Sequence, residues 1–256
     1  FLRVFFIKQS DIIFMHPQTV SYFILFKLIK KNNLFLYILD NSFFCICSYN
    51  THPIENIECL NCLGEIKPLD ECKPMPVKID KEKNINYLLK LQKISNEITF
   101  YAQNRLQSIL LKKHFGERTK IQIVGMDTKE ISSIERNSKN PKKYNYDVVF
   151  HGASIKPKGI NYVLKLAEYL PKYSFLIPDK IENVRKNINC NIPSNIIFKS
   201  MDWESGLYHE VRSAKIVINP SLWSAPIEGA LIKSAASNDN VATVISEYGF
   251  ENEIDC

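Results

Sequence analysis

The sequence predicts an α/β protein built on parallel sheets, and three observations carry this prediction. The chain has 256 residues, of which 45% are hydrophobic and 23% charged, as in a globular protein with a sizeable core. Apolar runs of four to six residues alternate with longer segments of helical period, which is typical of strand–helix units. Only eight glycines are present, which argues against a loop-rich or fibrous chain. The length allows two ordinary α/β domains.

The first half contains four such apolar runs. We expect strands at residues 11–16, 34–39, 98–102 and 121–124, and helices at residues 21–30, 85–94 and 103–114. Residues 41–83 hold five of the seven cysteines and show little periodicity. An irregular excursion is therefore expected there.

The second half alternates more regularly. We expect strands at residues 148–151, 174–177, 196–199, 216–218 and 241–245, and helices at residues 160–170, 205–214 and 226–236. Residues 127–146 are polar without an apolar period, which predicts a linker. The prediction is two Rossmann-like domains, residues 1–140 and 141–256, that face a cleft. Ligands of such sheets bind beyond the carboxyl ends of the strands.

Charge and hydropathy exclude some classes of protein. The formal net charge is +6, but Lys and Glu alternate along the chain, so we expect no nucleic-acid partner. The apolar run at residues 20–39 is interrupted by charges and predicts no membrane span. Position 1 is Phe, so we expect the chain to begin inside a longer reading frame, with both domains incomplete at the chain ends.

A turn with two glycines and two lysines follows the predicted strand at residues 148–151. Gly152, Lys156, Lys158 and Gly159 lie in this turn, just before a helix. Glycine lets a phosphate approach the backbone, a helix start offers unpaired N–H groups, and lysine supplies positive charge. The alternative is an ordinary turn with exposed lysines.

A second candidate site follows the predicted strand at residues 216–218. Its loop carries Ser221 and Trp223, and Pro226 is predicted in the first turn of the next helix. Glu228 then also falls in that turn, where its carboxylate could accept hydrogen bonds from sugar or ribose hydroxyls. The alternative is a carboxylate that only complements the helix dipole.

These motifs resemble the group 1 (glycogen-synthase-like) glycosyltransferases, which are retaining enzymes of the GT-B fold. The C-terminal domain of that family typically contains three sequence patterns in this order: strand-G-x-KG-helix, strand-PS-x-E-x-FG-helix, and a strand followed by a GG-x-x-E turn. The matching places here are Lys158–Gly159, Pro220–Ser221 and Gly249 to Glu253. The family's paired glutamates align with Ala225 and Lys233. The resemblance covers residues 145–256 well and the first half loosely.

The resemblance implies a hexosyltransferase that moves sugar from a nucleoside-diphosphate sugar to a saccharide or lipid-linked acceptor. Nothing in the sequence resembles the DxD pair that holds a metal in the other glycosyltransferase fold, so we expect a metal-independent reaction. The resemblance also implies that Lys158 neutralises the donor diphosphate and that Ser221 lines the donor pocket. Glu228 is the candidate catalytic residue. Either Glu228 and Lys156 do the work of the family's missing residues from shifted positions, or the donor contacts of this chain differ. Gly152, Gly159, Trp223, Lys233 and Glu253 complete the predicted substrate-binding set.

In the first half, residues 36–45 resemble a family segment of the form TLHD-x-x-x-x-C. Asp40 and Cys45 fall on its Asp and Cys, whereas Leu39 replaces its His. Asp40 is therefore a second catalytic candidate at the cleft. His16, after the first predicted strand, is a candidate for substrate binding; the alternative is a hydrogen-bonded structural histidine.

The cysteines of residues 41–83 allow two interpretations. Cys59 and Cys62 have the spacing of metal ligands, and Cys72 with Cys45 or Cys47 could complete a structural zinc site. The alternative is a set of buried thiols, kept reduced in the cytoplasm. No cofactor other than this zinc is expected.

The resemblance also implies a cellular setting. Such enzymes act in cell-surface polysaccharide or lipopolysaccharide synthesis, in the cytoplasm or in peripheral contact with the inner face of the membrane. Two other functions remain open: a nucleotide-sugar epimerase of the same fold, and a non-catalytic nucleotide-sugar-binding subunit.

Overall fold

The computed structural model describes residues 7–126, 144–188 and 191–254, so most of the predicted linker lies outside the described residues. The chain forms two compact units. The first unit comprises Phe1–Met126, Trp223–Ile227 and Glu247–Cys256, and the second comprises Asp127–Leu222 and Glu228–Ser246. Each contains a parallel sheet, which confirms the predicted α/β class.

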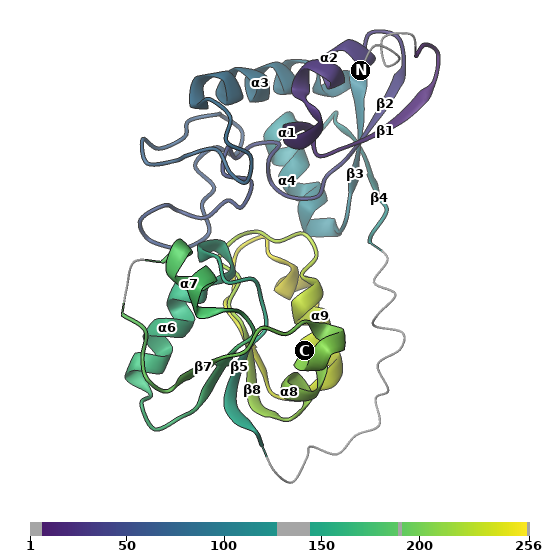
Figure 1. Ribbon diagram of the computed structural model, residues 1–256. Coiled ribbons are helices and arrows are strands. Elements are labelled where there is room, and N and C mark those ends of the chain that lie inside the picture. The colour runs from purple at the N-terminus through teal and green to yellow at the C-terminus, as the bar shows by residue number, and fades with distance from the viewer. Residues whose placement is uncertain (1–6, 127–143, 189–190, 255–256) are drawn as a thin grey trace. The chain divides into compact units, whose positions relative to one another are not determined.

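The first unit has a four-stranded sheet in the order β1-β2-β3-β4, with every pair parallel. Its strands are β1 (Asp11–Met15), β2 (Asn33–Tyr37), β3 (Ile98–Ala102) and β4 (Lys120–Ile123). Its helices are α1 (Pro17–Val20), α2 (Tyr22–Leu28), α3 (Lys81–Lys93) and α4 (Arg105–Phe115), and a short 3-10 turn, η2 (Ser95–Glu97), precedes β3. The helices gather on one side of the sheet (Figure 1). There they cover the alternate strand residues that form the core, such as Leu34, Leu36 and Phe100.

The ends of two helices follow from their sequences. The Asp80 side chain caps α3 by accepting from the Lys83 N–H (2.9 Å), and the Asn104 side chain caps α4 by accepting from the Gln107 N–H (2.7 Å). Gly116, with φ of 97°, ends α4. Between β2 and α3 the chain forms neither helix nor strand, apart from one bridge between Thr51 and Glu58. The predicted irregular excursion is confirmed.

Two segments from the second half of the sequence complete the first unit. Ser224 lies in a buried polar network, in which its carbonyl oxygen accepts from the Asn41 amide (2.8 Å) and its Oγ from the Asn50 amide (2.8 Å). Farther along, the Glu58 carboxylate accepts the backbone N–H groups of Glu247 (2.6 Å) and Tyr248 (3.2 Å). The first unit is therefore built from three separate stretches of chain.

This arrangement corrects the predicted start of the helix at residues 226–236. The Pro226 carbonyl oxygen accepts from the Asn104 amide inside the first unit, and the helix begins at Gly229 instead. Proline fits the first turn of a helix, but here tertiary hydrogen bonds hold its segment outside the helix.

The second unit has a five-stranded parallel sheet in the order β7-β6-β5-β8-β9. Its strands are β5 (Tyr146–Phe150), β6 (Phe175–Ile177), β7 (Ile196–Phe198), β8 (Ala214–Asn219) and β9 (Val241–Thr243). Its helices are α6 (Ile160–Tyr169), α7 (Ile181–Asn187), α8 (Tyr208–Arg212) and α9 (Gly229–Ser237), and its short helical turns are η3 (Lys156–Lys158) and η4 (Trp203–Leu207). A further short turn, η5 (Phe250–Glu253), belongs to the first unit.

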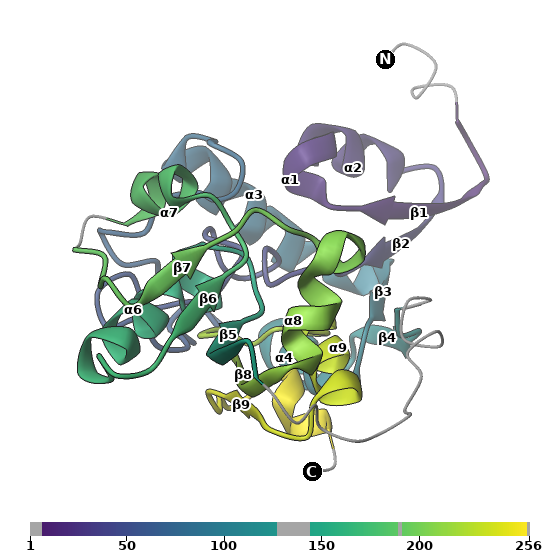
Figure 2. The ribbon, with the colours of Figure 1, turned by 60° about the horizontal axis from the view of Figure 1, so that its bottom comes forward.

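Helices cover both faces of this sheet, with α6 and α7 on one side and α8 and α9 on the other (Figures 1 and 2). Val148 and Phe150 of β5 pack with the α6 and α7 core, whereas Val149 between them packs with Leu207 and Val211. A strand buried on both faces reads as a continuous apolar run, as Val148–Phe150 of β5 do. The strand order reverses between β5 and β8, and ligands of such sheets bind at this switch point.

Two expectations for helices of the second unit need correction. α7 was not predicted, because residues 181–187 carry only Val184 as a fully buried apolar side chain. The expected helix at residues 205–214 is a π-helical turn, η4, followed by the short α8. Gly206, with φ of 130°, lies inside η4 and interrupts the helical conformation there. In the described residues, no helix has the length and apolar character needed to cross a membrane.

Candidate functional site

The predicted phosphate-binding turn follows β5 and begins at the switch point. In this turn η3 leads into Gly159, whose φ of 76° is in the left-handed region. The Leu222 N–H donates to the Pro157 carbonyl oxygen (2.8 Å), which ties the turn to the loop after β8. A Cβ on Gly159 would lie 2.8 Å from Cγ and 3.0 Å from the carbonyl carbon of Pro220. Gly159 is thus needed both for its conformation and for the close approach of Pro220.

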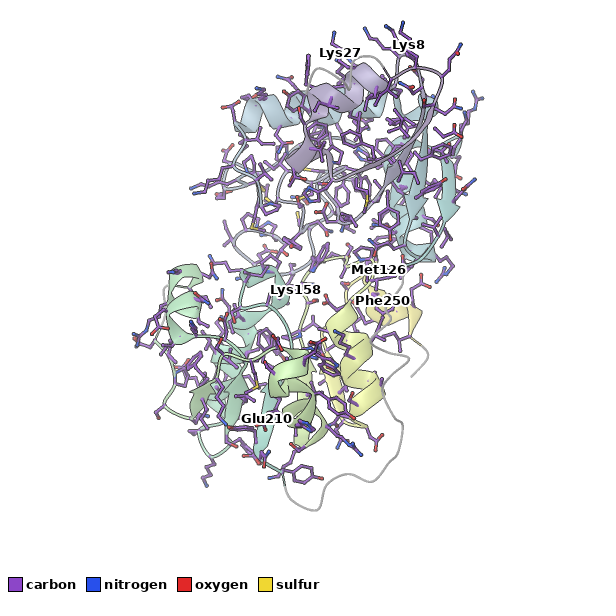
Figure 3. The ribbon with its side chains drawn as sticks, turned by 45° about the vertical axis from the view of Figure 1, so that its right-hand side comes forward. Lys8, Lys27, Met126, Lys158, Glu210 and Phe250 are labelled. Atoms are coloured by element: carbon purple, nitrogen blue, oxygen red, sulfur yellow. The ribbon has the colours of Figure 1, made fainter. Side chains whose placement is uncertain are left out.

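Three of the predicted residues meet between this turn and the start of α9. The Lys158 ammonium forms an ion pair with Oε2 of Glu228, and the Ser221 hydroxyl donates to the same oxygen (2.8 Å). Figure 3 marks Lys158 in the turn after β5. The side chains of Lys158 and Glu228 are only 16% and 10% exposed. A partly desolvated cation and a hydroxyl are therefore held together at the carboxyl ends of β5 and β8.

Glu228 occupies a different place from the one predicted. It is the N-cap residue of α9 rather than a first-turn residue, and its side chain makes no capping hydrogen bond. Its carboxylate is instead used by Lys158 and Ser221. Beside it, a Cβ on Gly229 would meet no atom within 4 Å, so there is open space at the first residue of α9.

A second group of side chains surrounds His151 and includes residues that were not predicted. Nδ1 of buried His151 is hydrogen-bonded to Oγ of Ser234 (2.8 Å), and its ring stacks on Trp203 (5.2 Å between centroids, 9° between planes). The Lys233 ammonium lies 5.2 Å from the centre of the Trp203 ring. Burial, and to a lesser degree the charge of Lys233, lowers the pKa of His151 to about 4, so this imidazole is neutral near pH 7.

The group around His151 gave only a weak signal in the sequence. His151 stands directly after a strand, but its partner Ser234 is 83 residues away. Trp203 lies in the short turn η4, which Gly206 interrupts and which periodicity does not predict.

In the first unit, the two predicted residues His16 and Asp40 are in contact. Nε2 of His16 lies 3.1 Å from Oδ2 of Asp40, and Oδ1 of Asp40 accepts the Ser42 N–H (2.9 Å). The Thr19 hydroxyl donates to the His16 carbonyl oxygen (3.0 Å) and lies 3.1 Å from Nδ1 of His16. Both ring nitrogens therefore face acceptors, which favours the imidazolium. The hydrogen bond to Asp40 raises the pKa of His16 above its usual value.

Other predicted residues lie elsewhere. Trp223 is buried in the first unit, where its ring meets Tyr49 edge-on (4.7 Å between centroids). Oε1 of Glu253 accepts the Leu106 N–H at the start of α4 (2.7 Å), a favourable position for a carboxylate. Lys156 is exposed, whereas Gly152 sits against the Phe150 ring, which a Cβ would approach to 3.0 Å. A motif match does not predict these contacts of Trp223 and Glu253 within the first unit.

The cysteines of the irregular excursion form a cluster around one small cavity. The four thiols considered for zinc line it: Cys45, Cys59, Cys62 and Cys72. Yet no three His, Cys, Asp or Glu side chains in the described part of the chain are placed to hold a metal ion. A hydrogen bond with Cys45 raises the pKa of Cys47 to about 12, and burial raises that of Cys62 to about 11. In the described residues these thiols are buried or half-buried and are not arranged as a formed zinc site.

The chain is similar in structure to several solved proteins. A chain of the GtfA/B complex aligns with 97% of this chain at a TM-score of 0.53 and 12% identity. An α,α-trehalose-phosphate synthase (UDP-forming) from Burkholderia vietnamiensis aligns with 95% of it at a TM-score of 0.49 and 12% identity. An α-glucosyltransferase in complex with UDP and DNA aligns with 92% at a TM-score of 0.37 and 15% identity.

The present chain covers 45% of the GtfA/B chain, 57% of the synthase and 79% of the glucosyltransferase, so it spans about half the length of the first two. No protein-family profile and no curated protein sequence matches it. The structural likeness to the GtfA/B chain, together with the two parallel sheets, places the chain in the GT-B fold class.

Proposed function

We propose that the protein transfers a sugar from a nucleoside-diphosphate sugar to an acceptor, and that the second unit binds the donor. One observation carries this proposal: Lys158, Ser221 and Glu228 converge at the switch point between β5 and β8. The GT-B fold and the resemblance of these positions to group 1 glycosyltransferases support the same function.

The chemistry of such a transfer fits these residues. The bond from the sugar to the diphosphate breaks, so negative charge develops on the leaving oxygens. A lysine ammonium in a partly desolvated turn and the unpaired N–H groups at the start of α9 can stabilise that charge without a metal. We propose Lys158 for this role, with Ser221 as a further hydrogen-bond donor.

Further details of the function are also proposals. The first unit would receive the acceptor, a saccharide or a lipid-linked one, with His16 and Asp40 at the ends of β1 and β2. The transferred group would be a hexose. The reaction would serve cell-surface polysaccharide or lipopolysaccharide synthesis at the cytoplasmic face of the membrane, as the family resemblance implies.

A panel of nucleotide sugars tests the donor site. Thermal shift would be measured with UDP-, GDP- and ADP-linked hexoses for the wild type, for Lys158→Met and for Lys156→Met. Lys156, which was expected to act with Glu228, is the matched comparison, because it lies in the same turn but is exposed. We expect at least one donor to stabilise the wild type and Lys156→Met, with the shift lost in Lys158→Met. Equal shifts in all three proteins would contradict the assignment of Lys158.

Product analysis separates the remaining functions. Sugar transfer to an added acceptor supports the transferase. An epimerised sugar nucleotide that forms without any acceptor would identify an epimerase. Donor binding that depends on Lys158, without turnover on a panel of saccharide and lipid-linked acceptors, would favour a non-catalytic subunit.

A further inference from the structure

The candidate donor site already contains an internal anion. A single carboxylate oxygen, Oε2 of Glu228, receives both the Lys158 ammonium and the Ser221 hydroxyl. This is the arrangement that a phosphate oxygen would adopt on the same two donors, because carboxylate and phosphate oxygens are recognised by the same charge-assisted hydrogen bonds. Glu228 thus satisfies the groups that an anionic ligand would need.

We propose that Glu228 acts as a built-in competitor of the ligand, so that a phosphate group binds Lys158 and Ser221 by displacing its carboxylate. This inference rests on the proposed function for its location and goes beyond it by assigning Glu228 a role in setting affinity. It replaces the expectation that Glu228 is a catalytic residue.

The position of Glu228 makes its displacement feasible. The residue is the N-cap of α9, but its side chain does not cap the helix, so its carboxylate can leave without breaking a helix hydrogen bond. The space beside Gly229 is open, whereas the turn of Lys158 is held by the close contact of Gly159 with Pro220. The cation therefore stays in place while the carboxylate moves.

The competing interpretation is a purely structural ion pair. A buried pair often contributes little net stability, since desolvation of both charges offsets their attraction. Both interpretations predict that loss of Glu228 changes stability. Only a competitor predicts that an anion binds more tightly once the carboxylate charge is removed.

The experiment uses inorganic pyrophosphate as a probe, measured by calorimetry at constant ionic strength on the full chain. The variants are Glu228→Gln, which keeps the shape but removes the charge, and Glu182→Gln, which makes the same change in net charge on an exposed residue of α7. We expect Glu228→Gln to bind pyrophosphate about tenfold or more tightly than the wild type. Glu182→Gln should bind as the wild type does, and Lys158→Met/Glu228→Gln should lose the gain.

Unchanged or weaker pyrophosphate binding by a folded Glu228→Gln would overturn the proposal, as would an equal gain in Glu182→Gln. If Glu228→Gln fails to fold, Glu228→Asp replaces it, because the shorter side chain keeps the charge but shifts the carboxylate from the two donors. Pyrophosphate should then bind more tightly than to the wild type, and a lack of gain would again contradict the proposal.

The two proposals fail in different ways. Binding of nucleotide sugars that depends on Lys158, without a gain in Glu228→Gln, would overturn only the competitor role. A gain for pyrophosphate, without nucleotide-sugar binding by any variant, would overturn the donor site and leave a general anion site.

Discussion

In the described residues, each unit holds a largely buried cation–carboxylate pair where two neighbouring parallel strands end. In the first unit His16 follows β1 and Asp40 follows β2; in the second, Lys158 follows β5 and Glu228 follows β8. The two pairs differ in the cation. A histidine can lose its charge near neutral pH, whereas a lysine keeps it.

The two pairs also differ in the strand order of the sheets to which they belong. The strand order of the first sheet runs without reversal, while that of the second reverses between β5 and β8. Only the second pair lies at a switch point, and only it is held by a turn that requires glycine. A permanent cation on a fixed turn suits a site for an anion, whereas a titratable pair suits a site whose charge changes with pH.

The largest effect should come from breaking the turn that holds the second pair. In Gly159→Ala, the new Cβ would meet the Pro220 backbone at a left-handed φ of 76°. We expect a loss of roughly 3 kcal/mol or more in unfolding free energy, from overlap and backbone strain together. Urea denaturation measures it. Gly229→Ala is the control, because its Cβ meets nothing within 4 Å, and it should change stability by less than about 1 kcal/mol.

Removal of one partner of the second pair should cost more than removal of both. Lys158→Met leaves the Glu228 carboxylate partly buried without its cation, which we expect to cost about 2–3 kcal/mol. The double variant Lys158→Met/Glu228→Leu should recover much of that loss. A double-mutant cycle in urea measures the coupling, and strictly additive effects would show that the pair is not energetically linked.

Two buried histidines, His114 and His151, set the pH background against which the first pair must be judged, because burial lowers the pKa of both. Burial lowers the pKa of His114 to about 4, and its Nδ1 accepts the Gly64 N–H (3.0 Å). Its unfolded pKa is near 6.5, so the unfolded state takes up the proton first, and stability falls as pH drops from about 6.5 to 4. We expect a loss of about 1–2 kcal/mol over this range. His114→Gln should flatten the curve, and an unchanged slope would contradict this account.

The smallest effect should come from the first pair, with the opposite sign. The folded pKa of His16 is raised, so its stabilising contribution is complete below about pH 6.5 and is lost as pH rises through the folded value. His16→Gln should therefore lower stability below pH 6.5 by less than about 1 kcal/mol and have less effect at higher pH. Proton NMR titration of the ring would test the cause. A His16 pKa at or below 6.5 would remove the contrast between the two pairs.

The regular elements could be predicted from the sequence because strands such as β5 and β8 contain short apolar runs and helices such as α6 have a clear apolar period. The turn of Lys158 and the loop of Ser221 could be predicted too, since the ends of parallel strands meet at one edge of a sheet. Their meeting on one oxygen of Glu228 could not, because it depends on where α9 begins.

The start of α9 was misplaced for a physical reason. Pro226 favours the first turn of a helix, but the Asn104 amide holds its carbonyl oxygen, and Asn41 and Asn50 hold Ser224. Hydrogen bonds between residues more than 100 positions apart leave no trace in local periodicity. The same holds for Glu253, whose motif position predicts a ligand contact but whose carboxylate accepts the Leu106 N–H.

Because the first unit is built from three separate stretches of chain, no single cut in the sequence separates the two units. A gene fragment that stops at residue 140 would encode β1 to β4 but lack Ser224, Pro226 and Glu253, leaving their partners Asn41, Asn104 and the start of α4 unsatisfied. A chain nicked once between residues 127 and 143 would instead keep every one of these bonds. The protein should thus behave as a split protein, whose two pieces stay together in native buffer and separate only in denaturant.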